Sequence, residues 1–490
     1  MTTRIIPTLI LNDGRPQGAS LPYTSTMLRS FFILLSVIVL SWACTPQNEL
    51  VSGDEDLRLS FSQDTVFFDT LFTSLPSTTQ RFRIINPNEG AVNIDRISLS
   101  ENSGVFSMII HGKEGNTLED IYLRGGDSLM VLVEARISAS EETLPFVIEE
   151  QVVVEANGHN NTLWLQAWGQ NAYFHRMGER ISSAEIWAAD RPHVVMDSLF
   201  IEETGALTIE KGSKIYFNND AYMLIRGSLN VEGTPQDTVT FQHIRREEDY
   251  DTIAGQWLGL YFTPSSKNNR ISGAYIKNAY DGVYVWSDEI PETPAMIIEN
   301  TTIENMASSG VFLAGTYAKI HNSIINNCIG YVLACASGGK YELIHNTIAN
   351  YNHSFRIEQP TVGFSSAFVP GRQEDPSVRL DDLSVKMENN IIWGDFEEMI
   401  ILIEATDYGF DFDVNNNILR TSADNIFGTE NFYESDPGFY YLPFEQQFFL
   451  AEDAFARDKG LPTELTTDRS GEVRDKKPDL GALEWRMLEE

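Results

Sequence analysis

Two histidines and a glutamate stand at matching positions of neighbouring repeats in the middle of this 490-residue sequence. They are Glu299, His321 and His345, and each is followed by an asparagine. In a stack of parallel strands, which lie roughly 4.8 Å apart, these three side chains would form one column on one face. Two imidazoles and a carboxylate at that pitch suit a divalent cation such as zinc, or acid–base chemistry. The alternative is a polar ladder on a solvated sheet, which is the commoner arrangement.

A second set of candidates is aromatic. Trp257, Tyr280, Tyr284 and Trp286 lie close together in the sequence, with Asp281 among them. Aromatic rings stack on sugar rings, and carboxylates accept hydrogen bonds from sugar hydroxyls. This set therefore predicts a carbohydrate-binding groove. The alternative is that many of these rings pack in the core or in turns.

The elements that must position these side chains are short strands in a repeat of about 22 residues. Each repeat has an apolar residue, a variable position, an asparagine, a small or polar residue and an apolar pair. The aligned asparagines are Asn300, Asn322, Asn346, Asn389 and Asn416. One residue per turn has to adopt a left-handed conformation, which Asn and Gly tolerate best, and stacked asparagines can hydrogen-bond between coils. A helical solenoid would need a 3.6-residue apolar period, so the pattern predicts a parallel β-helix.

Residues from about 180 to 430 resemble the parallel β-helix repeats of the pectin-lyase-like superfamily. The segments AGQWLGLYF at 254–262, ISGAYIKNAYDGVYV at 271–285 and SGVFLAG at 309–315 resemble coils of that group in surface lipoproteins of Gram-negative bacteria. We therefore expect a right-handed parallel β-helix of about ten coils over residues 176–435.

The last segment resembles a terminal pattern of the same group, D-x-x-G-x-x-R followed by D-x-G-A-x-E. The matching residues are Asp468, Gly471, Arg474, Asp479, Gly481, Ala482 and Glu484. An open end coil would expose unpaired strand edges and the core, both of which need a cover. We therefore interpret residues 436–490 as a C-terminal cap.

Residues 59–175 have a different pattern, in which apolar side chains alternate along short runs separated by turn residues. Examples are RFRIINPN at 81–88 and DSLMVLVEARI at 127–137. Such runs are typical of half-buried strands, so we expect a β-sandwich and an all-β chain. The segment resembles an immunoglobulin-like domain of the ASPM-SPD-2-Hydin type, with Phe82, Ile84 and Asn86 in the places of the family's F-x-I-x-N motif.

The N-terminal region carries an apolar run, FFILLSVIVL at 31–40, followed by SWAC, which ends at Cys44. The run is too short for a bilayer span of ~20 residues and has the length of a signal-peptide core. It resembles a lipoprotein signal, in which the cysteine after a small residue receives the lipid. We predict a signal region over 1–43, with Met27 as an alternative start, and a tether over 44–58. The protein would then be exported and anchored at the outer membrane or cell surface; a plain secretory signal or a short anchor is the alternative.

The charge limits the partners. There are 70 acidic and 35 basic residues and a net charge of −35, a field that repels nucleic acid and disfavours polyanions. The resemblance alone leaves activity open, but the Asn-Thr-Asp, Gly-His-Gly and Arg-Ile-Lys motifs of polygalacturonase-like members are not present in their arrangement. We therefore expect non-catalytic glycan binding or adhesion, with membrane and polysaccharide as partners. The alternatives are a polysaccharide lyase or glycoside hydrolase and a structural component of a surface assembly. No cofactor is expected beyond an optional divalent cation.

Overall fold

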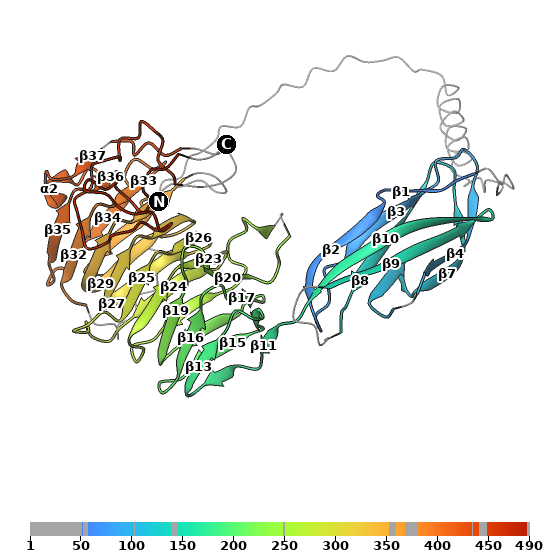
Figure 1. Ribbon diagram of the computed structural model, residues 1–490, viewed down its shortest axis with the longest axis horizontal. Coiled ribbons are helices and arrows are strands. Elements are labelled where there is room, and N and C mark those ends of the chain that lie inside the picture. Colours follow the sequence, from blue (N-terminus) through green and yellow to red (C-terminus); the bar gives the residue numbers. More distant parts are fainter. Residues whose placement is uncertain are drawn as a thin grey trace, which may run out of the picture.

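The computed structural model describes residues 51, 57–101, 103–138, 146–247, 250–351, 359–367, 380–433, 435–440 and 448–487. The predicted signal region, Cys44 and most of the predicted tether lie outside these ranges. In the described ranges, no helix has the length and apolar character needed to cross a membrane. The chain is all-β, with sheets at the N-terminal side followed by a parallel solenoid, as predicted (Figure 1).

The N-terminal domain consists of two five-stranded sheets around one apolar core. Its strands are β1 (Ser60–Phe61), β2 (Thr65–Phe72), β3 (Gln80–Ile85), β4 (Val92–Leu99), β5 (Phe106–Ile110), β6 (Lys113–Glu114), β7 (Thr117–Leu123), β8 (Ser128–Ala135), β9 (Phe146–Ala156) and β10 (His159–Gln170). One sheet has the order β1-β3-β8-β5-β6 and the other β2-β10-β9-β4-β7. Alternate side chains of β8 are buried, because one face of its sheet lies against the core. We call this unit the sandwich.

The solenoid winds three sheets, which we name A, B and C in the order in which the chain meets them after β11. Sheet A contains β12 (Glu179–Ile181), β15 (Ser198–Ile201), β18 (Tyr222–Ile225), β21 (Gly259–Phe262), β24 (Asp281–Trp286), β31 (Val362–Ser365) and β34 (Ile400–Ile403). Sheet B contains β13 (Ala184–Trp187), β16 (Ala206–Glu210), β19 (Ser228–Glu232), β22 (Asn269–Ser272), β25 (Met296–Glu299), β32 (Leu383–Glu388) and β35 (Phe410–Asn415). Two longer strands, β27 (Ser309–His321) and β29 (Leu333–Ile344), run through the corner and belong to both.

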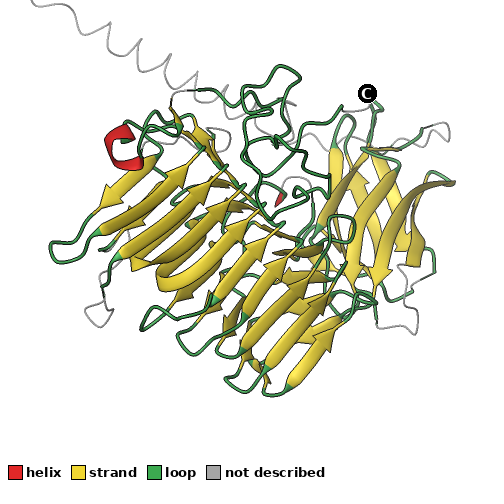
Figure 2. Cartoon of the chain, turned by 60° about the vertical axis from the view of Figure 1, so that its left-hand side comes forward, coloured by secondary structure: helices red, strands yellow, loops and turns green. Residues whose placement is uncertain are grey.

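Sheet C contains 11 strands in the described residues, which agrees with the predicted number of about ten coils. They are β11 (Tyr173–His175), β14 (His193–Val195), β17 (Lys214–Phe217), β20 (Val239–His243), β23 (Ala274–Lys277), β26 (Thr302–Met306), β28 (Ile324–Cys328), β30 (Thr347–Asn350), β33 (Ile391–Gly394), β36 (Ile418–Leu419) and β37 (Phe432–Tyr433). All described pairs in the solenoid are parallel, and Figure 2 shows the stacked strands. A short helix, α2 (Asp424–Phe427), follows β36, and its Phe427 packs against the core.

Columns of apolar side chains fill the solenoid. In sheet B, one column lies in register from coil to coil and consists of Ile209, Val231, Ile271, Ile298, Ile320, Leu343, Met387 and Val414. All of these side chains are buried. Burial of each contributes about 1.5–3 kcal/mol, and only the neighbouring coils provide it. The cysteines Cys328 and Cys335 are also buried and not disulfide-bonded, consistent with small core residues.

The turn from sheet B to sheet C carries the expected left-handed residues. Asn300, Asn322, Asn389 and Asn416 have φ values between 47° and 59°. The fifth expected member is wrong by one place, because His345 with φ 54° holds the left-handed position and Asn346 follows it. Asn346 belongs instead to a second column, in which the backbone N–H of each member donates to the side-chain oxygen of the next; its members are Thr301, Ser323, Asn346, Asn390, Asn417 and Asn431.

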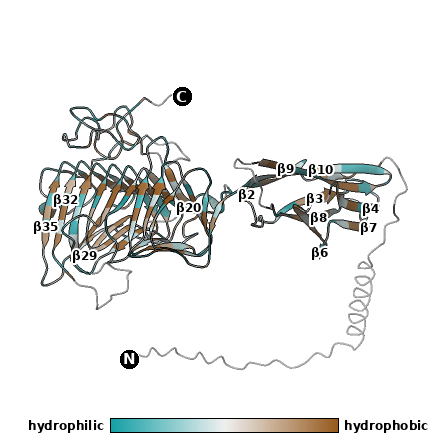
Figure 3. Cartoon of the chain, turned by 60° about the horizontal axis from the view of Figure 1, so that its bottom comes forward, coloured by the Kyte–Doolittle hydropathy of each residue, from teal (hydrophilic) through white to brown (hydrophobic). Residues whose placement is uncertain are grey.

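The described part of the predicted cap lies along the outer face of sheet C rather than across the open end (Figure 3). We call residues 448–487 the C-terminal strap. It needs to lie there because the outer face of sheet C carries apolar side chains such as Ile324, Ile391 and Trp393, which the strap buries. The amide of Asn389 donates to Leu461 O at 2.8 Å, and Ala482 N donates to Thr347 Oγ1 at 3.0 Å.

The residues of the terminal pattern hold the strap together. The Arg474 guanidinium is buried and forms an ion pair with Glu484 at 2.5 Å. Its other terminal nitrogen donates to Asn322 Oδ1 at 2.9 Å, which ties the strap to the solenoid. The Asp468 carboxylate accepts hydrogen bonds from the backbone amides of Ser470 and Glu484. The residues of the terminal pattern therefore fix the conformation in which the strap crosses sheet C.

The sandwich extends beyond the N-terminal end of the solenoid and contacts its first coils (Figures 1 and 3). Phe72 at the end of β2 packs against Tyr216 of sheet C, with ring centroids 5.0 Å apart. The guanidinium of Arg246 lies 5.3 Å from both ring centroids and donates to the Thr70 carbonyl. Apolar packing, cation–π contacts and a hydrogen bond therefore fix the joint between the two units.

Candidate functional site

The outer face of sheet A carries a series of aromatic side chains because of how its strands alternate. In β15, β21 and β24 a central aromatic residue stands between two residues that point into the core. Phe200, Tyr261 and Tyr284 are these central residues, and each is half-buried. Since successive residues of a strand point to opposite faces, all three rings point away from the core.

These rings form one continuous row, which we call the aromatic ladder and define as Phe200, Tyr222, Tyr261, Tyr284, Trp286 and Phe312. Neighbouring ring centroids lie 6.1 Å apart for Phe200 and Tyr222, 6.3 Å for Tyr222 and Tyr261, and 5.8 Å for Tyr261 and Tyr284. Tyr284 stacks on Phe312 at 4.7 Å and meets the edge of Trp286 at 5.7 Å. Each ring is held in place by the next, across successive coils.

The two ends of the ladder differ. At the N-terminal end, Arg180 and Arg226 lie over the Phe200 ring at 4.7 and 5.4 Å, and both form ion pairs with Glu202. At the other end Phe312 is only 4% exposed and joins an apolar cluster with Ala334. The accessible part of the ladder therefore runs from Phe200 to Trp286.

The structure brings together some of the predicted carbohydrate-binding residues. Tyr284 and Trp286 are neighbours in the ladder. Asp281 is buried beneath it, where its carboxylate accepts hydrogen bonds from Tyr261 Oη at 3.4 Å and from Ser309 N at 3.2 Å. Asp281 thus positions a ladder ring and does not present its carboxylate to solvent.

The other two predicted carbohydrate-binding residues lie elsewhere. Trp257 is fully buried, stacks on Phe217 at 4.0 Å and donates from Nε1 to Lys277 O at 2.9 Å. It is a core residue, as the alternative interpretation held. Tyr280 is 47% exposed at the corner between sheets C and A, outside the ladder.

The predicted column of Glu299, His321 and His345 does not form. Glu299 and His321 are opposite one another in sheet B, but Ile344 takes the next place, and His345 lies one residue later, in the left-handed turn beneath the C-terminal strap. A slip of one residue exchanges the two faces of a strand. His345 is fully buried, and its Nε2 accepts from Asn389 Nδ2 at 2.9 Å. Burial, with Arg474 nearby, lowers its pKa to about 2.

The outer face of sheet B is a ladder of ion pairs, as the alternative interpretation expected. Glu299 pairs with Arg270, and Glu342 pairs with Lys319 at 3.0 Å. His321 Nε2 lies 3.2 Å from Glu342 Oε1, and burial lowers the pKa of His321 despite this carboxylate. Over the described ranges, no cluster of three or more His, Cys, Asp or Glu residues is arranged to hold a metal ion.

Sequence reasoning missed Phe200, Tyr222 and Phe312. Their signal is a short motif, an aromatic residue next to inward aliphatic residues, as in LFI at 199–201, YML at 222–224 and VFL at 311–313. These motifs recur in strands that pair in sheet A, but the distance between them varies with the length of the intervening loops. Strand pairing was needed to align them.

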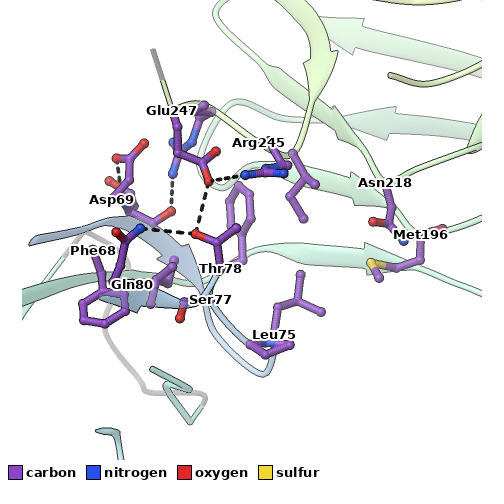
Figure 4. Close-up of a pocket in the computed structure, with 16 residues that line it drawn as sticks. Phe68, Asp69, Leu75, Ser77, Thr78, Gln80, Met196, Asn218, Arg245 and Glu247 are labelled. Atoms are coloured by element: carbon purple, nitrogen blue, oxygen red, sulfur yellow. Dashed lines mark hydrogen bonds and ion pairs between the residues drawn. The ribbon is translucent and has the colours of Figure 1, made fainter. Parts of the chain in front are cut away.

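A cavity of about 330 Å³ lies at the joint between the sandwich and the solenoid (Figure 4). Leu75 and Met196 provide apolar walls, and Glu247 projects toward Thr78 and Arg245. Glu247 accepts hydrogen bonds from both at 3.2 Å. Burial raises the pKa of Glu247, but a hydrogen bond from its own backbone amide, the hydrogen bond and charge of Arg245 and the Thr78 bond together outweigh burial, and the net shift is downward. Because these polar groups hydrogen-bond to one another, the cavity is better explained as part of a structural contact between the two units than as a ligand site.

A comparison with protein families agrees with the solenoid architecture. Residues 180–348 match the family model described as right handed beta helix region. No curated protein matches the chain. Among solved structures, pectate lyase Pel9A is 13% identical, with 64% of this chain and 86% of that chain covered at a TM-score of 0.29. The catalytic domain of a GH87 alpha-1,3-glucanase in complex with tetrasaccharides is 9% identical, with 69% and 82% covered at a TM-score of 0.23.

Other similarities cover less of this chain. An ASH/PapD-like domain of human CEP192 is 11% identical, with 26% of this chain and 94% of that domain covered at a TM-score of 0.17. The chain spans only 34% of a Vibrio cholerae VesB protease, at 15% identity, 27% coverage of this chain and a TM-score of 0.17. Such low identities and scores carry no information on activity. The chain therefore has an N-terminal β-sheet domain followed by a right-handed β-helix region.

Proposed function

We propose that this protein binds glycans on the outer face of sheet A without cleaving them. The observation that carries the proposal is the aromatic ladder, in which the rings from Phe200 to Trp286 are half-buried and packed on one another. Each ring therefore has part of its surface open to solvent while its orientation is fixed. Rings that are already ordered lose little conformational freedom when a sugar stacks on them.

The charge of the protein favours a neutral polysaccharide. The net charge of −35 opposes the approach of a polyanion. The two arginines at the N-terminal end of the ladder, Arg180 and Arg226, are already paired with Glu202. Tyrosine hydroxyls, such as that of Tyr222, can exchange hydrogen bonds with sugar hydroxyls beside the stacked ring.

The test is a binding assay with the purified protein and a panel of neutral glucans, mannans and xylans. Replacing Tyr284 and Trp286 together by alanine should weaken binding at least tenfold, since loss of stacking costs about 1.4 kcal/mol or more. The matched control is Tyr122→Ala, which removes a 39% exposed aromatic ring from the sandwich. A Tyr284→Phe variant retains the ring and the binding. Equal affinities of the double variant and the control would refute the proposal.

The same incubation distinguishes binding from cleavage. Unsaturated or reducing ends released from any member of the panel would identify a lyase or hydrolase, which is the alternative function. Retention without released ends is the result expected for a binding protein. A protein that neither retains nor cleaves any of these polysaccharides would favour the third alternative, a structural component of a surface assembly.

We further propose that the protein is an exported lipoprotein with its lipid on Cys44, that it lies at the outer membrane or cell surface, and that its sandwich is immunoglobulin-like. The N-terminal apolar run and the cysteine that follows it support this proposal. Cells labelled with a radioactive fatty acid should yield a labelled protein, and Cys44→Ser should remove the label. Label that persists in the Cys44→Ser variant would contradict the assignment.

A further inference from the structure

The sandwich exposes large apolar side chains on the outer face of one sheet. Trp164 and Trp168 of β10 are 45% and 43% exposed, and Phe67 of β2 and Val147 of β9 are 64% and 41% exposed. Gln166, between the two tryptophans, lies opposite Phe67, and Trp168 lies opposite Val147. The four side chains therefore share one surface across three neighbouring strands. Several large apolar side chains exposed on one face are typical of an interaction site.

The polar side chains between these rings are of the kind that sugars need. The two tryptophans are four residues apart on one strand, hence on the same face and roughly 13 Å apart. The Gln166 amide between them donates to Glu149 Oε1 at 2.8 Å. Gln151 and Thr65 flank Trp164 on the adjacent strands. Rings with amide, hydroxyl and carboxylate groups between them can stack on sugar rings and hydrogen-bond their hydroxyls together.

The charges of this face exclude several other partners. None of the residues just named on it is a Lys or Arg, and Glu149 adds a negative charge. Arg96, on the same sheet, is paired with Glu155. An anionic lipid surface or a polyanion would therefore find no unpaired positive charge among these residues, and a second copy of this chain would add another −35. A neutral ligand with many hydroxyl groups is the partner that this chemistry favours.

We propose that the outer face of β2, β10 and β9, centred on Trp164 and Trp168, is a second binding surface for neutral polysaccharide. It is separate from the aromatic ladder, because it lies on the sandwich and not on the solenoid. Three strands side by side form an open face. We therefore expect this surface to bind along the length of an extended or insoluble polysaccharide and not at a chain end.

The test compares the full protein with a variant that carries Trp164→Ala and Trp168→Ala. Sedimentation with insoluble neutral glucans, mannans and xylans, and affinity electrophoresis in soluble ones, should show at least tenfold weaker binding by the variant to one or more of them. Because both side chains are exposed, the fold should survive, and a Trp164→Phe, Trp168→Phe variant should retain part of the binding. The matched control is Met130→Ala, since Met130 is 47% exposed on the opposite sheet of the sandwich.

The ladder variant separates this inference from the proposed function. If the surface on β10 binds independently, the variant that lacks Tyr284 and Trp286 still binds the polysaccharide whose binding is lost when Trp164 and Trp168 are replaced. Unchanged binding of the tryptophan variant across the whole panel overturns the inference and leaves the ladder untouched. The inference is also overturned if this surface captures a protein and no polysaccharide, and if that capture is lost when Trp164 and Trp168 are replaced, because the ligand would then be of another class.

Discussion

His345 is a buried, uncharged residue of the turn from sheet B to sheet C, and it should make the protein sensitive to acid. Replacing it by asparagine tests this, because Asn322 and Asn389 occupy the same left-handed position in the neighbouring coils. At pH 7 the imidazole is neutral in the folded chain and mostly neutral in the unfolded chain. His345→Asn should therefore change the free energy of unfolding at pH 7 by no more than about 1 kcal/mol.

The size of the acid effect follows from the two pKa values. The unfolded histidine titrates near 6.5, whereas burial and Arg474 lower the pKa of the folded one to about 2. The lowered pKa means that the stabilisation is fully present above pH 6.5 and declines as the pH falls, since only the unfolded chain takes up the proton. Between pH 7 and pH 5 the loss is about 1.9 kcal/mol for this one side chain.

The assay is urea unfolding of the wild-type protein and the variant at pH 7 and at pH 5. His193 and His243, whose pKa values burial lowers to about 4, also destabilise the protein in acid, but they do so in both proteins and cancel in the difference. The wild-type protein should lose about 1.9 kcal/mol more than His345→Asn. Equal losses in the two proteins would falsify the view that His345 is held neutral.

Three further predictions concern the stability of the fold. Trp257→Ala should cost about 3–5 kcal/mol in urea unfolding, because the ring fills the core, whereas Tyr280→Ala should stay within about 0.5 kcal/mol. Arg474→Ala leaves Glu484 buried without its cation and should cost about 3–5 kcal/mol, with faster proteolysis within the strap; unchanged cleavage would contradict this. Asn346→Ala removes an amide bonded to two backbone groups and should cost about 1–3 kcal/mol, measured in the same way.

The fold could be predicted from the sequence because it depends on a periodic pattern. The register of the repeats was harder to predict, because two alignments that differ by one residue both fit the letters. The letters I-H-N at 320–322 recur at 344–346, and that match placed His345 beside His321. The inward residues give a different frame. Ile320 and Ile325 are five apart, and so are Leu343 and Ile348, which makes Leu343 the counterpart of Ile320. The spacing of core residues was therefore a better guide than the identity of polar ones.

The candidate site was only partly predictable for a different reason. Tyr284 and Trp286 are close in sequence and were found, whereas Phe200 and Tyr222 join them only through strand pairing across coils. Trp257 was misplaced because an aromatic residue beside a turn has the same local pattern whether it points inward or outward. Trp164 and Trp168 follow the alternation of β10, but the sequence alone does not show that both rings stay exposed in the described part of the chain.

The course of the strap changes how the solenoid can come apart. A stack in which each coil touches only its neighbours can open one rung at a time from either end. Here a single stretch of chain is tied at Asn322, Thr347, Asn389 and Asn416, which belong to successive turns. Unfolding of the last coil therefore also requires the hydrogen bonds between the strap and several other coils to break. Melting of this half should accordingly occur in one concerted step instead of by gradual fraying.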